Sequence, residues 1–196
     1  MNFLAHAVLS FGDPGVLAGN MISDFVKGKQ QFDYPTDIRR GIMLHRKIDA
    51  FTDEHAATAA AKEPFRAAYR LYSGAIIDVI YDHFLANDER EFPGNTLAGF
   101  AQQTYGILNA HIEVLPPNFR AMLPYMEKHD WLYNYRTKDG IGKSLEGLVR
   151  RATYLTESNT AMKLLQQHYQ LLHDCYHQFW NDVKPYAREQ AELLKG

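Results

Sequence analysis

The stretch IIDVIYDHFL, from Ile76 to Leu85, decides the fold class. Its apolar residues Ile76, Ile80 and Phe84 recur every four positions, which places them on one face of an α-helix. Apolar residues recur with this helical spacing along nearly the whole chain, and no segment shows the sustained alternation of period two that is typical of strands. The sequence therefore predicts an all-α protein.

Prolines and glycines predict where the helices begin and end. Pro14, Pro35 and Pro64 are expected in the first turns of three helices, of which the first ends near Gly28 and the third continues to Phe84. The rest of the chain is predicted as helices over about 96–111, 119–129 and 145–155, an irregular segment over 131–143, and a long last helix over 160–194 with a kink at Pro185. Because there is no internal repeat and no linker, residues 1–196 are expected to form a single compact helical domain.

The composition excludes several classes of protein. Of 196 residues, 46% are hydrophobic and 22% are charged, as in an ordinary globular protein. The net charge of −2 provides no global basic field for nucleic acid. The single cysteine, Cys175, excludes an internal disulfide. There is no apolar run long enough to span a membrane and no positively charged leader, so we expect a cytoplasmic protein without membrane contact.

Polar residues spaced four apart mark three of the predicted helices, and each such pair shares one helix face: Asn20/Asp24, His45/Asp49 and Asp78/Asp82. One such pair is usually a solvated face or a capping network, but three in a small helical domain predict a shared polar or metal-binding centre. Asp78 and Asp82 lie within an apolar run, where an ionised carboxylate needs a partner, and a divalent cation is one such partner. His6 also interrupts an apolar run, although a lone histidine is more often structural.

Four basic residues fall within nine positions that contain no acid: Arg39, Arg40, Arg46 and Lys47. Beside a carboxylate-rich centre such a cluster would attract a phosphate-bearing or acidic partner. A solvated helix face is an equally good interpretation from the sequence alone.

Two His-Asp dipeptides are weaker signals. His129 is expected near a helix end, where capping is the simpler role. His173 and His177 are four apart and, with Asp174, could bind a metal, but the glutamines around them favour a hydrated face.

Longer motifs resemble those of the acyl carrier protein phosphodiesterase family. They extend over most of the chain and stand in order: MNFLAH at 1–6, GN at 19–20, DFVKG at 24–28, HRKIDAFTD at 45–53 and YDHFL at 81–85. Small departures are Lys47, where arginine is expected, and Ala56, where proline is common.

The resemblance implies an activity. Members of this family hydrolyse the phosphodiester that links 4′-phosphopantetheine to a serine of holo-acyl carrier protein, which yields apo-acyl carrier protein and free 4′-phosphopantetheine. The family is thought to need a divalent metal, typically Mn²⁺, and to be distantly related to the helical His-Asp metal phosphohydrolases. The order Asp82-His83 departs from the signature of that wider group.

Carried onto this chain, the resemblance suggests site roles. The expected metal ligands are His45, Asp82 and His83, followed by Asp49 and Asp78. Asp24 is expected as a further ligand or general base, with Asn20 orienting it and His6 behind the ligands or assisting the leaving group. The basic cluster would bind the acidic carrier protein.

Alternatives remain at this point. One is a helical metal phosphohydrolase that acts on a nucleotide or another small phosphate ester. Another is a non-catalytic helical binding module whose polar pairs are structural. A haem or di-iron protein is disfavoured because the Glu-x-x-His motif is missing from the predicted centre.

Overall fold

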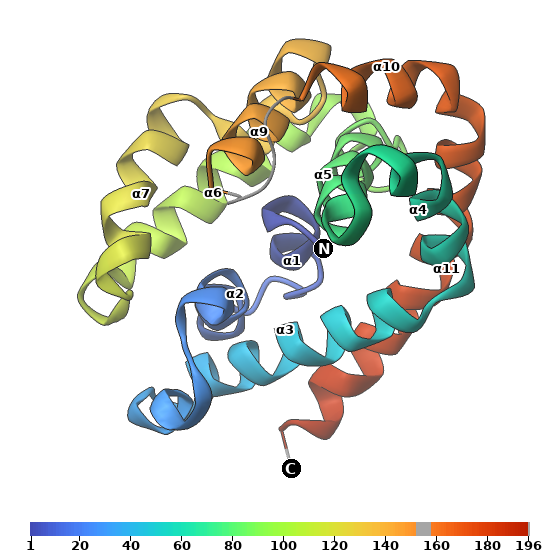
Figure 1. The fold of residues 1–196 in the computed structure, drawn as a ribbon. Coiled ribbons are helices and arrows are strands. Elements are labelled where there is room, and N and C mark those ends of the chain that lie inside the picture. The colour runs from blue at the N-terminus through green and yellow to red at the C-terminus, as the bar shows by residue number, and fades with distance from the viewer. Residues whose placement is uncertain (152–157, 196) are drawn as a thin grey trace.

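The computed structural model describes residues 1–151 and 158–195, and every regular element within them is helical (Figure 1). The α-helices are α1 (Phe3–Val8), α2 (Pro14–Ile22), α3 (Thr36–Glu54), α4 (Ala56–Tyr69), α5 (Ser73–Ala86), α6 (Leu97–Ala110), α7 (Pro117–Lys128), α8 (Trp131–Asn134), α9 (Lys138–Arg151), α10 (Asn159–Gln167) and α11 (Tyr169–Leu193). Short 3-10 turns are η1 (Ser23–Phe25), η2 (Gly28–Asp33), η3 (Arg70–Tyr72), η4 (Pro93–Asn95) and η5 (Ile112–Val114). The all-α prediction is confirmed.

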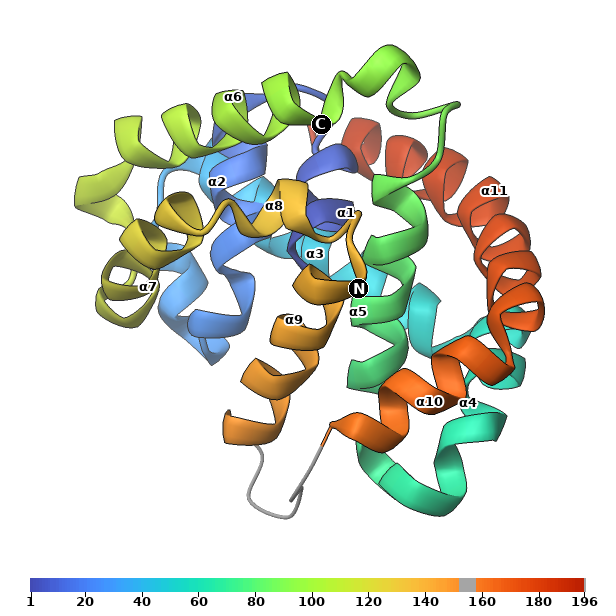
Figure 2. The same cartoon turned by 90° about the horizontal axis from the view of Figure 1, so that it is seen from above.

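The short helix α1 lies at the centre of the fold, with the other helices arranged around it (Figures 1 and 2). Leu4, Ala5 and Ala7 are completely or almost completely buried there. One continuous set of buried apolar side chains extends from α1 to α11, which confirms a single compact helical domain. No helix in the described ranges is long and apolar enough to cross a membrane.

Two glycines bring α2 and α3 into backbone contact. A side chain at Gly19 would collide with the carbonyl oxygen of Ile38, and one at Gly41 would collide with that of Val16. This close approach requires glycine on both helices. As a consequence, the residue after Gly19 on α2 is placed directly against the polar face of α3.

Pro64 does not begin a helix, contrary to the prediction. It lies inside α4, which starts eight residues earlier, after the side chain of His55 accepts the N–H of Ala57 at 3.2 Å. The predicted third helix is also two helices, because Arg70 takes a left-handed conformation (φ 48°) between α4 and α5. Proline has no backbone N–H to donate, which favours the first turn of a helix, but α4 accommodates Pro64 in its interior.

Residues 131–143 were expected to be irregular, and this was wrong, since α8 and the start of α9 are helical. Gly140 lies close against the backbone of Asn134, so glycine is required here for packing rather than for an irregular turn.

The last predicted helix is divided at His168, between α10 and α11, while Pro185 lies inside α11. The predicted helix over 145–155 is confirmed up to Arg151, and its remaining residues lie outside the described ranges. The first helix, α2, ends at Ile22 and is followed by η1, so it ends earlier than expected.

Candidate active site

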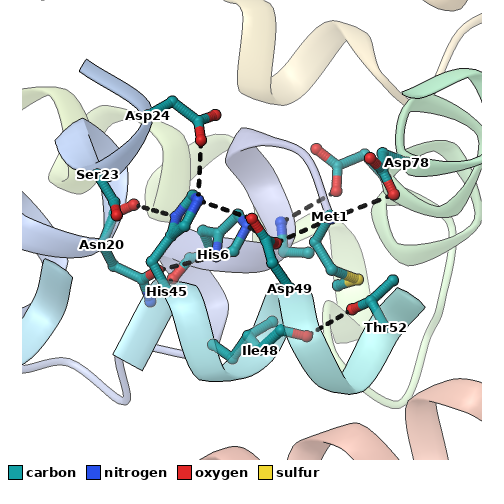
Figure 3. A network of polar contacts seen from close by, with 12 residues as sticks. Met1, His6, Asn20, Ser23, Asp24, His45, Ile48, Asp49, Thr52 and Asp78 are labelled. Atoms are coloured by element: carbon teal, nitrogen blue, oxygen red, sulfur yellow. Dashed lines mark hydrogen bonds and ion pairs between the residues drawn. The ribbon is translucent and has the colours of Figure 1, made fainter. Parts of the chain in front are cut away.

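Four elements bring their polar side chains together on one side of α1 (Figure 3). His6 comes from α1, Asn20 from the end of α2, and Asp24 from η1. His45 and Asp49 lie one turn apart on α3. The predicted helix-face pairs of α2 and α3 therefore do converge, and His6 joins them.

His45 is held at both ring nitrogens. Its Nδ1 lies 2.8 Å from the backbone oxygen of Asn20, which can only accept a hydrogen bond, so Nδ1 carries a proton. Its Nε2 lies 3.0 Å from Asp49 Oδ2 and 3.2 Å from Asp24 Oδ1. The outer nitrogen of His45 is thus directed at two carboxylates.

His6 is oriented by the side chain of the same asparagine. Asn20 Nδ2 donates to the backbone oxygen of His6 at 2.9 Å and to Ser10 Oγ at 3.1 Å, so Oδ1 is the atom that faces the ring. His6 Nδ1 donates to that Oδ1 at 2.8 Å. His6 Nε2 is buried without a hydrogen-bond partner, 3.3 Å from Asp49 Oδ1. Asn20, through two oxygens, therefore directs the Nε2 atoms of both imidazoles toward Asp49.

The two imidazoles differ in charge. Burial, and to a smaller extent the neighbouring His45, lower the pKa of His6 to about 4. Burial would also lower the pKa of His45, but its contacts with Asp24 and Asp49 raise it to about 9. Burial would raise the pKa of Asp49, yet His45 and His6 hold it far below its usual range. Without a cation, neutral His6, protonated His45 and ionised Asp49 coexist at neutral pH.

These residues fit a divalent cation. One ligand atom each from His6, His45 and Asp49 lies within 4.8 Å of the other two. Imidazole nitrogen and carboxylate oxygen together suit Mn, Fe or Zn. Histidine ligands typically donate their other ring N–H to a carbonyl or carboxylate, as both rings do here. The orphaned Nε2 of buried His6 is a lone pair that a cation would satisfy.

Asp24 lies on the solvent-exposed side of the group formed by His6, His45 and Asp49. Its side chain is 74% exposed, whereas that of His45 is 6% exposed. The hydrogen bond from His45 lowers the pKa of Asp24. Beside it lies a cleft of about 350 Å³ that is also lined by Lys27 and by Pro117 and Asn118 at the start of α7. A substrate could therefore reach the group from the Asp24 side.

Asp78 has a different partner from the one predicted. Its Oδ1 lies 3.1 Å from the ammonium of Met1, which also lies 3.3 Å from Asp49 Oδ1. Although burial alone would lower the pKa of this ammonium, Asp78 and Asp49 raise it to about 11. Asp78 thus compensates a buried positive charge at the edge of the group and does not converge with His6, His45 and Asp49.

Asp82 is directed at the start of α1. Its two oxygens accept the backbone N–H groups of Leu4 at 2.8 Å and Ala5 at 3.1 Å. Burial raises its pKa to about 7, although these two hydrogen bonds act in the opposite direction. Because each oxygen accepts an N–H, Asp82 holds the start of α1, and with it His6, and it is not part of the group formed by His6, His45 and Asp49.

His83 points away from the group, into a separate cavity. Its Nδ1 donates to the backbone oxygen of Tyr135 at 2.7 Å. Successive residues on a helix face directions about 100° apart, and here Asp82 faces α1 while His83 faces the cavity. The structure therefore does not bring His83 together with His6, His45 and Asp49.

The four basic residues of α3 form two neighbouring stripes, because seven residues separate Arg39 from Arg46 and Arg40 from Lys47. Arg46 Nη2 donates to the backbone oxygen of Val26 at 3.0 Å, close to the Asp24 side of the group. Arg40 Nη2 donates to the backbone oxygen of Lys195 at 3.1 Å, at the far end of the chain. Only the first stripe therefore faces the segment that carries Asp24.

The residues of the second suspected metal centre, His173, Asp174 and His177, have other hydrogen-bond partners. His173 and His177 face each other through their Nε2 atoms at 2.9 Å, while Arg90 donates to Nδ1 of His177 at 2.6 Å. Asp174 accepts from Gln170 at 2.8 Å. His173, Asp174 and His177 of α11 are thus hydrogen-bonded to each other, to Gln170 or to Arg90.

Two contributors were missed at the sequence level. Ser10 fixes the amide of Asn20, and the Met1 ammonium faces Asp49 and Asp78. Lys27, which the sequence offers as a neighbour of the basic cluster on α3, lines the cleft beside Asp24. No spacing rule would have indicated Ser10 or the Met1 ammonium.

The family model for acyl carrier protein phosphodiesterase matches residues 1–183. The chain belongs to the acyl carrier protein phosphodiesterase family. It is 35% identical over 191 residues to "Acyl carrier protein phosphodiesterase" of Yersinia pestis, covering 97% of this chain and 99% of the relative. Proteins of the same name from Enterobacter sp. (strain 638) and Photorhabdus laumondii are 34% and 31% identical, covering 97% and 98% of this chain and 99% and 96% of the relatives.

Membership of the acyl carrier protein phosphodiesterase family makes the chain a phosphoric diester hydrolase, which confirms the prediction of an enzyme. It excludes the non-catalytic binding module as the main function. No solved structure matches the chain. The distant relationship to the His-Asp phosphohydrolases therefore stays a prediction.

Proposed function

We propose that this enzyme hydrolyses the phosphodiester between 4′-phosphopantetheine and a serine of holo-acyl carrier protein, releasing apo-acyl carrier protein and free 4′-phosphopantetheine. The relatives are named for acyl carrier protein, which supports the carrier protein as the substrate. The observation that carries the proposal is the convergence of His6, His45 and Asp49, with both imidazoles oriented by Asn20. A cytoplasmic location is part of the proposal.

The residues that would hold a divalent cation, Mn²⁺ in our proposal, are His6, His45 and Asp49. Such a cation supplies Lewis-acid activation of the phosphoryl group and of a water molecule near neutral pH. His6 is ready to ligate because its Nε2 is already unprotonated and unpartnered. His45 must first lose the proton that Asp24 and Asp49 stabilise.

Asp24 is the proposed general base. The low pKa of its carboxyl arises mainly from the protonated ring of His45, so deprotonation of His45 removes that cause. The exposed carboxylate of Asp24 is then free to accept a proton from the attacking water. Asn20 acts through other residues: it holds the two imidazoles and does not itself face the cleft.

The cleft beside Asp24 is the proposed site of the phosphodiester. Lys27 lines it and offers a cation to the phosphate. Arg46 and Arg39, on the stripe of α3 that faces this segment, would bind the acidic carrier protein, with Arg40 and Lys47 at the edge of the same surface. This arrangement places positive charge around the mouth of a site whose own carboxylates would otherwise repel a phosphate.

The proposal is tested by incubating the enzyme with purified holo-acyl carrier protein and Mn²⁺ and measuring the carrier by intact-mass spectrometry. Loss of the prosthetic arm in the presence of Mn²⁺, and not after chelation, is the expected result. A parallel reaction with nucleotides and small phosphodiesters tests the alternative. Hydrolysis of those compounds without release of apo-acyl carrier protein would assign the enzyme to small phosphate esters.

A further inference from the structure

A second cavity, of about 690 Å³, is lined by residues of α5, α9, α10 and the start of α11, and by Asn87 and Arg136 from the segments after α5 and before α9. Its volume is in the usual range for small-molecule sites. His83, on α5, lines it, but none of His6, His45 and Asp49 does. The cavity is therefore separate from the candidate active site.

The deep part of the cavity wall is apolar. Ile141 on α9 and Leu165 on α10 are 0% and 3% exposed, and both line the cavity together with the half-buried Met162. Apolar surface of this kind takes up an aliphatic chain, since transfer of the chain out of water is favourable.

In the part of the chain that the structure describes, the charged side chains on the cavity wall are both positive. They are Arg136 and Lys138. Among the described residues no carboxylate lies within ion-pair distance of either cation; the adjacent Asp139 is paired with Lys143 at 2.6 Å. Lys138 is exposed and Arg136 is half-buried, so this charge lies nearer to solvent than the apolar wall.

His83 adds no charge to the cavity wall, and hydrogen bonding holds its ring in place. It is 6% exposed, and its Nδ1 proton is used on the backbone oxygen of Tyr135. Its Nε2 is therefore an acceptor, 3.5 Å from the hydroxyl of Tyr169, which also lines the cavity. Burial lowers the pKa of His83, and the charge of Lys138 acts in the same direction, so the ring stays neutral.

We propose that this cavity binds an amphipathic anion: an aliphatic chain seated against Ile141, Met162 and Leu165, with its anionic head at Arg136 and Lys138. The inference concerns binding alone and stands apart from the proposed hydrolysis. Arg136 also donates to Asn95 and to the hydroxyl of Tyr133, but within residues 1–151 and 158–195 neither Arg136 nor Lys138 has a carboxylate partner. Cations without a carboxylate partner beside an apolar cavity favour a ligand that carries both an anionic and an apolar part over one that carries either alone.

The test is calorimetric titration of the full-length enzyme with octanoate, octan-1-ol and inorganic phosphate. Saturable binding of octanoate that is at least about tenfold tighter than that of the other two probes is the expected result. Equal binding of octan-1-ol would show an apolar cavity without anion recognition, and equal binding of phosphate would show a plain anion site. Either outcome, or no binding of octanoate, overturns the proposal.

Two variants and a matched control locate the binding. Lys138→Glu should weaken octanoate binding by about tenfold or more, and Met162→Trp should block it by filling the cavity. Lys128→Glu is the control, because it makes the same charge change at an exposed position of α7 outside the cavity. If Lys128→Glu weakens binding as much as Lys138→Glu, the anion is not bound where we propose. Far-ultraviolet circular dichroism of each variant confirms that the helices are retained.

Discussion

The imidazole rings of His6 and His45 stack face to face, with centroids 3.9 Å apart and planes inclined by 13°. Two protonated rings at this separation would repel each other, and the pKa values of about 4 for His6 and about 9 for His45 show how the protein avoids it. One ring is kept neutral and the other is kept charged by Asp24 and Asp49. Since Asn20 holds both Nδ1 atoms, the stacked pair presents its two Nε2 atoms to a single carboxylate, that of Asp49.

Metal affinity should depend steeply on pH. At pH 7 His6 is already neutral and Asp49 is ionised, whereas His45 carries a proton that a ligand cannot keep. Binding of Mn²⁺ should therefore release about one proton at pH 7, and the affinity should rise about tenfold per pH unit until pH reaches about 9. Titration calorimetry in buffers of different ionisation enthalpy counts the protons. A count near zero would show that His45 is not a ligand.

Substitution of Asp49 and substitution of Asp82 should have different effects on metal affinity and on stability. Asp49→Asn removes a ligand and should reduce Mn²⁺ affinity by at least roughly tenfold. Asp82→Asn weakens the hold on Leu4 and Ala5 and should destabilise the fold by about 1–3 kcal/mol while leaving Mn²⁺ affinity within about twofold. Thermal unfolding with and without Mn²⁺ measures both effects. Loss of Mn²⁺ binding in Asp82→Asn would return Asp82 to the ligand set.

Asn20 should matter for metal binding although it is not a ligand. Asn20→Ala removes the acceptor of His6 Nδ1, and the freed ring should lower Mn²⁺ affinity roughly 10- to 100-fold. A matched control is Thr104→Ala, which removes a buried hydroxyl from α6, away from the site. Equal Mn²⁺ affinity in both variants at matched stability would mean that Asn20 is only structural.

The basic surface of α3 should affect recognition of the carrier protein rather than chemistry. Arg39→Glu should raise KM for holo-acyl carrier protein several-fold, leave kcat nearly unchanged and reduce the dependence of KM on salt. Lys163→Glu on α10, an exposed position away from α3, is the control for the change in net charge. Steady-state kinetics at two ionic strengths measures both variants. An unchanged KM in Arg39→Glu would remove Arg39 from the docking surface.

Much of the site could be predicted because it follows helix periodicity. His45 and Asp49 are four apart on α3, and they do share the face that meets His6. The pair Asp78/Asp82 has the same spacing, yet Asp78 faces the Met1 ammonium and Asp82 the N–H groups of α1. Spacing predicts which residues share a helix face; it does not show which partner that face meets.

The contacts of Asp78 and Asp82 could not be predicted because their partners have no sequence signature. Backbone N–H groups at the start of α1 and the ammonium of Met1 are the partners of these carboxylates, and neither appears in a motif. The same limit applies to the fold. Pro64 marks a missing N–H wherever it stands, and the breaks at Arg70 and His168 are set by packing that only the assembled helices show.

The most direct test of the account follows the prosthetic arm of holo-acyl carrier protein by intact-mass spectrometry. Wild-type enzyme with Mn²⁺ is compared with chelator-treated enzyme and with Asp49→Asn and Asp24→Ala. The account predicts that wild-type enzyme converts the carrier to its apo form, that chelation and Asp49→Asn abolish conversion, and that Asp24→Ala slows it at least ~10²-fold. Conversion by Asp49→Asn at the wild-type rate, or full activity in chelator, would contradict the claim that His6, His45 and Asp49 hold the catalytic cation.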